Sequence, residues 1–396
     1  MSEKRSRRLR GLAVAGGVTG GVALGAALAW GVPRYLARRT RASSADPYAH
    51  EPFELPPQSS VRTVQTRDGV AVHVETAGPA DADLTVVFAH GYMQDMGTFY
   101  FLRKAIVNAG RDVSLRAVLY DQPGHGRSGP VPRTEYGIDD LAEVLHDVLA
   151  AVAPSGPLVL VGHSMGGMTI QTYARVHAEA FHERVKGVAF LSSSAAGLDT
   201  VETKPMRALR RLRRTVLPML QQVAGWTPDL IDRSRLLAGD LGWLLTRRAA
   251  FGHTDPPASL VSLVEAMNRR ASIQSIVGYA RAILDHDETA TLPQFKGLPA
   301  LIVVGDADLL TPPEHSRRLA AALAGSRFVL IPEAAHSPQL EYPGEISQLL
   351  LEMIDKVAAE IGDDAVAGDA SPPEDEGVRA RRWTPFSRAD RSRLEP

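Results

Sequence analysis

The chain has 396 residues, of which 44% are hydrophobic and 22% are charged, a composition that suits a globular protein and argues against disorder over most of its length. Its 44 Lys and Arg residues nearly balance its 45 Asp and Glu residues, so the protein as a whole has no electrostatic attraction to nucleic acid. It contains no cysteine, which excludes disulfides, thiol catalysis and thiolate metal sites.

The N-terminal region, residues 1–41, is basic on both sides of an uncharged stretch at residues 11–33. As a helix, this stretch would span about 30 Å of hydrocarbon, so we expect a transmembrane anchor. Two signal-like alternatives remain: residues 6–8 resemble the start of a twin-arginine export signal, and residues 27–29 offer a cleavage site. Because arginines flank the stretch on both sides, its orientation stays open. We therefore expect a membrane-associated protein with one N-terminal hydrophobic segment, either anchored or exported.

Short runs rich in β-branched residues alternate with helical patterns from residue 61 onward, after a linker predicted at residues 42–60 from its Pro, Ser and acidic content. Mostly apolar strands separated by helices predict an α/β fold, with a mostly parallel sheet covered by helices on both faces. The predicted strands lie at residues 70–74, 84–88, 115–119, 158–161, 185–191, 300–304 and 328–331.

The alternation breaks between residues 198 and 297, where helical patterns occur without a convincing strand. This predicts a helical insertion in a core built from residues 61–197 and 298–361. The first predicted helix of the insertion, near residues 203–217, carries arginines opposite its apolar side. A helix with this pattern either lies on an anionic membrane surface or packs on the core with its arginines in solvent. Residues 362–396 are first acidic and then basic, which is typical of a disordered charged tail.

A predicted strand leads directly into the sequence Gly-His-Ser-Met-Gly-Gly at residues 162–167, and a helical pattern follows. A serine in such a tight turn needs small residues two positions before and after it, which Gly162 and Gly166 supply. The N–H of Met165 lies at a helix N-terminus, where a developing oxyanion is favoured. We therefore predict a nucleophile elbow with Ser164 as the nucleophile, the alternative being a glycine-rich turn without chemistry.

A second short motif, His90-Gly91-Tyr92, follows the predicted strand at residues 84–88. The glycine would let the backbone of this loop approach a site at the carboxyl edge of the sheet. A plain strand-ending turn is the alternative interpretation.

Serine is a weak nucleophile near neutral pH, so it needs a general base and a group that orients this base. Candidates follow the last two predicted strands. Asp306 and Asp308 come after the strand at residues 300–304, and His336 comes after the strand at residues 328–331.

This order of serine, aspartate and histidine, each after a successive strand, resembles that of serine hydrolases of the α/β-hydrolase fold superfamily, such as bacterial esterases and monoacylglycerol lipases. The resemblance covers about residues 61–361 and implies an eight-stranded sheet with a helical lid. It implies that Asp308 orients His336, the general base, whereas Asp306 caps the turn. It also implies that the N–H of Tyr92 is the second oxyanion donor, and the sequence around Glu341 continues the family pattern.

For the other histidines and acidic residues, the sequence favours a structural role over a chemical one. The segment at residues 121–129, which contains His125, resembles a structural turn of the same family. Asp285, His286 and Asp287 are adjacent in a loop, and three adjacent residues are poorly placed to bind one ion. We therefore predict no metal and no cofactor.

The predicted function is hydrolysis of a carboxylic ester, lipophilic or lipid-derived, through an acyl-enzyme formed on Ser164. Related folds also support cofactor-free haloperoxidase or perhydrolase chemistry and carbon–carbon bond hydrolysis, and a non-catalytic, membrane-tethered binding protein is a further alternative. A serine at the nucleophile position argues against epoxide hydrolase and dehalogenase activity, because those relatives use aspartate. The expected partner is a small acyl ester; nucleic acid is not expected, and the oligomeric state stays open.

Overall fold

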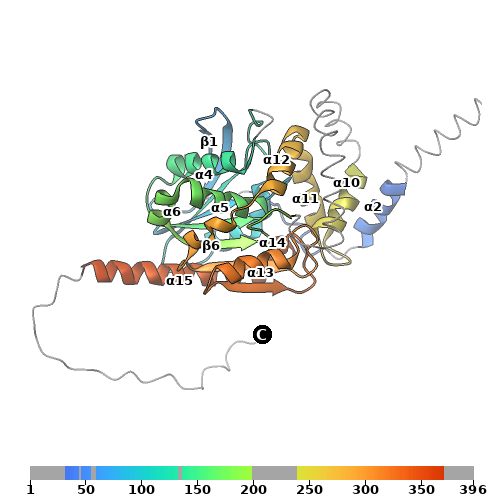
Figure 1. Cartoon of the computed structure of the whole chain (residues 1–396). Coiled ribbons are helices and arrows are strands. Elements are labelled where there is room, and N and C mark those ends of the chain that lie inside the picture. Colours follow the sequence, from blue (N-terminus) through green and yellow to red (C-terminus); the bar gives the residue numbers. More distant parts are fainter. Residues whose placement is uncertain (1–31, 44–45, 55–58, 133–135, 199–238, 370–396) are drawn as a thin grey trace, which may run out of the picture. The chain divides into compact units, whose positions relative to one another are not determined.

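A computed structural model describes residues 32–43, 46–54, 59–132, 136–198 and 239–369 (Figure 1). Contacts divide the chain into a compact unit that ends at Ala358 and a second unit that starts at Ala359. The sheet, the insertion and all residues of the predicted site belong to the first unit. In the second unit, the described residues continue helix α15, which runs over Pro343–Asp369.

The first unit is built on one eight-stranded sheet with the order β1-β2-β4-β3-β5-β6-β7-β8. The pairs β1–β2 and β2–β4 are antiparallel and all others are parallel, so the predicted mostly parallel, eight-stranded sheet is confirmed. The strands are β1 (Ser59–Gln65), β2 (Ala71–Ala77), β3 (Leu84–Ala89), β4 (Leu115–Tyr120), β5 (Leu158–His163), β6 (Val185–Leu191), β7 (Ala300–Gly305) and β8 (Arg327–Ile331).

The central strands are apolar throughout because both faces of the sheet are covered. All six residues of β3, β5 and β7 are buried. Along β3, Val87 belongs to the core cluster that includes residues of α4 and α5, whereas Phe88 contacts Phe99 of η2, with ring centroids 5.0 Å apart. Alternate residues of one strand therefore build two separate helix-covered layers.

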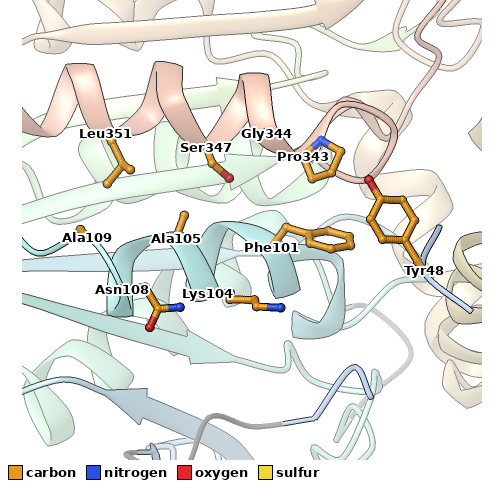
Figure 2. Close-up of a pocket in the computed structure, with 10 residues that line it drawn as sticks. All are labelled: Tyr48, Phe101, Lys104, Ala105, Asn108, Ala109, Pro343, Gly344, Ser347 and Leu351. Atoms are coloured by element: carbon orange, nitrogen blue, oxygen red, sulfur yellow. The ribbon is translucent and has the colours of Figure 1, made fainter. Parts of the chain in front are cut away.

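Helices cover the sheet as Figure 1 shows. Helices α4 and α5 pack against each other on one face, and α3 and α15 line a common pocket (Figure 2). The elements of the core are η2 (Met96–Phe99), α3 (Tyr100–Val107), α4 (Ile138–Val152), α5 (Met165–Val176), α6 (Ala178–Arg184), α13 (Pro313–Ala322), α14 (Pro338–Glu341) and α15.

The chain leaves the sheet after β6 and returns at β7. The described part of this excursion is helical, with α10 (Gly239–Ala250), α11 (Ala258–Arg270), α12 (Ile273–Asp285) and η4 (Thr289–Phe295). Its one β contact in the described residues is an isolated bridge between Ala196 and Asp287. The helix predicted near residues 203–217 lies outside the described residues.

The N-terminal prediction falls largely outside the described residues, since only positions 32 and 33 of the stretch at residues 11–33 are described. They open helix α2 (Val32–Ser43), which packs against α10. Among the described residues, no helix combines the length and the apolar character needed to cross a membrane. In the predicted linker, Tyr48 and Phe53 contact the ring of Phe101 on α3, and β1 starts at Ser59.

Candidate active site

Ser164 lies at the sharp turn between β5, which ends at His163, and α5, which begins at Met165. Its backbone has φ 52° and ψ −117°, a conformation that a residue with a side chain rarely adopts. Strain of this kind costs about 1–3 kcal/mol and persists only where the surroundings impose it. Here the Ser164 N–H donates to the carbonyl of Leu191 at 2.9 Å, and the hydroxyl of Ser193 donates to the Ser164 carbonyl at 2.8 Å.

The two glycines that flank Ser164 are required by close backbone contacts. A Cβ on Gly166 would overlap the backbone carbonyl of Ala89, at the end of β3. A Cβ on Gly162 would lie 2.5 Å from the Cα of Gly167, below any normal contact distance. Without side chains at these two positions, the turn can close on itself at Gly162 and pack against β3 at Gly166.

The loop at residues 90–92 passes directly beside the elbow. A Cβ on Gly91 would lie 3.1 Å from the Cβ of Ser164 and 2.7 Å from Nδ1 of His163. The backbone after β3 thus approaches Ser164 as the sequence predicts. Tyr92 also reaches the insertion, because its hydroxyl donates to the carbonyl of Ile276 on α12.

His90 holds this loop in place as a neutral ring. Its Nε2 accepts a hydrogen bond from the backbone N–H of Gln122 at 2.8 Å, so Nδ1 carries the proton and donates to the Gly91 carbonyl at 2.8 Å. Burial lowers the pKa of His90 to about 4, which keeps the ring uncharged near neutral pH. The geometry makes His90 a support for the loop backbone.

Asp308 and His336 form the clearest polar pair of the site. The Nδ1 of His336 donates to Oδ2 of Asp308 at 2.9 Å, while Oδ1 of Asp308 accepts the backbone N–H groups of Leu310 and Thr311, both at 2.9 Å. Burial by itself would raise the pKa of Asp308, but the charge of His336 and the hydrogen bonds from His336 and Thr311 outweigh it and lower the pKa below its ordinary value. Asp308 therefore stays ionised and holds the imidazole with Nε2 turned away from the carboxylate.

Asp306 plays a different part. Its Oδ1 accepts the backbone N–H of Glu333 at 2.8 Å, and Glu333 has a left-handed φ of 60°. This bond joins the turn after β7 to the turn after β8. The acid that contacts His336 is Asp308.

His163 links the elbow to the histidine loop across 173 residues of sequence, a contact that we did not predict. Its Nε2 donates to the backbone carbonyl of His336 at 2.8 Å, and the two ring centroids are 5.0 Å apart. Burial lowers the pKa of His163 to about 3, so the ring is neutral. The residue before Ser164 thus fixes the backbone of His336.

Ser164, Asp308 and His336 are therefore brought to one edge of the sheet. Among the described residues, Ser164 Oγ forms no hydrogen bond with His336, whose ring bonds through Nδ1 to Asp308 and contacts the Thr311 hydroxyl. Such bonds between nucleophile and base often tighten only when substrate is present. The bond to Asp308 occupies Nδ1 of His336, so Nε2 is the ring nitrogen that a proton from the serine hydroxyl would reach.

Glu341 is a residue near the site whose role the sequence did not reveal. Its Oε1 accepts the N–H of Ala335, the residue before His336, and its Oε2 accepts the N–H of Gly252, just after α10, both at 2.7 Å. Burial outweighs these bonds and raises the pKa of Glu341 to about 7. The carboxyl group therefore connects the histidine loop to the insertion.

Two other features are separate from these residues. In the described part of the chain, no three His, Asp or Glu side chains are grouped so as to hold a metal ion. A surface pocket of about 470 Å³ lies between α3 and α15, and Tyr48, Phe101 and Leu351 are among the residues that line it (Figure 2). Its wall contains none of the predicted site residues.

Residues 85–343 match the model of a family described as alpha/beta hydrolase fold. The chain is similar to a pimeloyl-[acyl-carrier protein] methyl ester esterase from Yersinia enterocolitica, with 26% identity over 69% of this chain and 94% of that protein. It is also similar to a monoacylglycerol lipase from Mycolicibacterium smegmatis, with 25% identity over 65% of this chain and 79% of that protein.

Among solved structures, a membrane phospholipase A matches with a TM-score of 0.58 and 20% identity. The match covers 89% of this chain and 99% of that one, so it extends beyond residues 85–343.

Proposed function

The chain belongs to the α/β-hydrolase fold family, and on this premise we propose that it hydrolyses a carboxylic ester with Ser164 as the nucleophile. The observation that carries the proposal is the bond between His336 Nδ1 and Asp308, at the sheet edge where the strained elbow presents Ser164. A buried carboxylate that holds a histidine near a serine is the arrangement needed to activate the hydroxyl.

The proposed reaction has two halves. His336 Nε2 removes the proton of Ser164 Oγ as this oxygen attacks the ester carbonyl carbon, and the N–H groups of Met165 and Tyr92 stabilise the resulting oxyanion. The C–O bond to the leaving group then breaks, and the leaving alkoxide takes the proton from His336. Water, deprotonated by His336, attacks the acyl-serine. The bond between the acyl carbon and Ser164 Oγ then breaks, His336 returns the proton to this oxygen, and the acid is released, while Asp308 stabilises the imidazolium in both halves.

The proposed substrate is a lipophilic or lipid-derived ester. Leu309 and Leu310, directly after Asp308, expose 47% and 44% of their surface, so apolar side chains flank the site. The named activities of the monoacylglycerol lipase and the phospholipase point the same way. With the hydrophobic stretch at residues 11–33, they support a proposed membrane association.

We further propose that residues 198–297 form a cap inserted between the two parts of the core. Its described helices contact loops around the site: Arg270 of α11 pairs with Asp95 at 2.5 Å, and α12 accepts the bond from Tyr92. A cap in this position would control access to Ser164.

The test combines labelling and turnover. The full chain should react covalently with a fluorophosphonate probe and should hydrolyse p-nitrophenyl esters, and Ser164→Ala should abolish both. A Ser164→Ala variant with full ester turnover would overturn the proposal, whereas labelling without ester turnover would favour one of the other chemistries of this fold.

A further inference from the structure

Helix α2 is attached to the insertion, through its contact with α10. Ala37 is fully buried in a cluster with Trp243 of α10. Arg41 pairs with Asp240 at 2.8 Å, and its guanidinium lies 4.7 Å from the centre of the Trp243 ring. The segment that directly follows the uncharged stretch is therefore fixed to the proposed cap.

Both of these helices expose apolar and basic side chains. Nine large hydrophobic side chains of the described residues are strongly exposed, and four of them lie on α2 and α10. On α2, Tyr35 and Leu36 expose 62% and 44% of their surface; on α10, Leu241 and Leu245 expose 44% and 61%. Exposed arginines lie on the same two helices. We call the following set the α2–α10 face: Arg34, Tyr35, Leu36, Arg38, Arg39, Leu241, Leu245 and Arg248.

Two acidic groups near this face, among the described residues, are paired with arginines. Asp240 bonds Arg41, and Glu265 of α11 pairs with Arg269 at 3.1 Å. The face thus presents positive charge together with exposed leucine and tyrosine side chains. A soluble surface has no need of this combination, whereas an interfacial helix uses it.

We propose that the α2–α10 face lies on the surface of an anionic phospholipid bilayer. Arginine side chains bind phosphate headgroups, and apolar side chains enter the boundary between headgroups and acyl chains. The position of α2 along the chain agrees with this proposal, because α2 begins at Val32, where the uncharged stretch of membrane length ends. Basic residues next to such a stretch are attracted to anionic lipid.

The consequence for function rests on the proposed esterase activity. Because α2 packs on α10, the membrane would contact the cap. Gly252, just after α10, donates its N–H to Glu341, which also bonds the histidine loop. A substrate could then pass from the lipid layer under the cap toward Ser164. This assigns the substrate to lipids of the same bilayer.

The absence of cysteine allows a direct test in the full chain. Leu245→Cys would carry an environment-sensitive dye, and the protein would be reconstituted in phosphatidylcholine vesicles with and without phosphatidylglycerol, doped with nitroxide-labelled lipid. The same dye on Val61→Cys, where Val61 lies on β1 and is 53% exposed, serves as the matched control. We expect strong quenching at position 245 in anionic vesicles, several-fold weaker quenching in neutral ones, and little at position 61.

Charge variants complete the test. Arg38→Gln with Arg39→Gln should reduce the quenching at position 245 several-fold. Arg281→Gln with Arg317→Gln removes the same charge from exposed side chains on α12 and α13 and should leave the quenching unchanged. Quenching at position 245 no greater than at position 61, or equal in neutral and anionic vesicles, would overturn the proposal. A second protein found bound to the α2–α10 face would overturn it as well. The readout does not depend on turnover, so loss of esterase activity with intact quenching would count only against the proposed function.

Discussion

The carboxylate of Glu341 accepts a 2.7 Å hydrogen bond from the backbone N–H of Ala335, the residue that precedes His336. Its other oxygen accepts the N–H of Gly252. Gly252 lies so close to the loop that a Cβ would overlap the Glu333 carbonyl. One side chain therefore bridges the segment after α10 and the loop that carries the proposed general base.

We predict that Glu341→Gln lowers kcat by up to about 100-fold while Ser164 still reacts with a fluorophosphonate probe, because a displaced base weakens catalysis without removing the nucleophile. The glutamine amide has one acceptor oxygen for two N–H donors, so one of them loses its partner. Steady-state kinetics separates kcat from KM. Glu345→Gln, close by in the sequence at the start of α15, is the control, and equal kcat values in the two variants would refute the prediction.

The same carboxyl group predicts a pH dependence of stability. The pKa of Glu341 is raised to about 7 in the folded protein, so its contribution to the free energy of unfolding is present below its ordinary pKa and is lost as the pH rises through about 7. Chemical denaturation from about pH 5 to about pH 8 should show the free energy of unfolding of the wild type falling relative to that of Glu341→Gln, because the other titrating groups are the same in both proteins. Parallel pH profiles for both proteins would contradict it.

At the elbow, we predict that Ser164→Gly stabilises the protein by about 1 kcal/mol relative to Ser164→Ala, because glycine adopts a positive φ without strain. Both variants lack the hydroxyl, so both should lose ester turnover. Urea unfolding curves measure the difference between them. If the alanine variant proves as stable as the glycine variant, the backbone at Ser164 is not strained as described.

Asp308 and Asp306 offer a matched pair. Asp308→Asn should lower kcat by about 10⁴-fold, since an asparagine amide favours the wrong tautomer of His336. Asp306→Asn should retain nearly full turnover, because its side-chain oxygen can still accept the N–H of Glu333. Ester hydrolysis by the two purified variants decides the point, and similar losses in both would remove the special role of Asp308.

Three buried histidines predict loss of stability in mild acid. Burial lowers the pKa of His90 to about 4 and those of His125 and His163 to about 3, so these rings stay neutral in the fold while the unfolded chain takes up protons. The free energy of unfolding should fall as the pH drops from about 6.5 toward these values, by at most about 1.4 kcal/mol per pH unit for each ring. His125→Gln should show a shallower slope, and an unchanged slope would contradict this account.

Much of the fold follows from local sequence pattern. The apolar runs at β3, β5 and β7 are recognisable because both faces of a central parallel strand are buried. The edge strand β1 is missing from the predicted strands because its sequence carries no apolar run. Most of its side chains are exposed, and Val64 is its buried residue. Likewise, Ser164 could be found because a strand, glycines and a helix meet within a few residues.

The tertiary structure alone decided which groups meet across long stretches of chain. Sequence order made Asp306 and Asp308 both available after β7, and the path of the two neighbouring turns placed Asp308 against His336 and Asp306 against Glu333. The bond from His163 to the His336 carbonyl and the two hydrogen bonds of Glu341 depend on backbone groups, which every residue carries and no motif marks. The sequence by itself therefore determined the chemical groups and the edge of the sheet where they lie; their pairing was decided by how the turns pack.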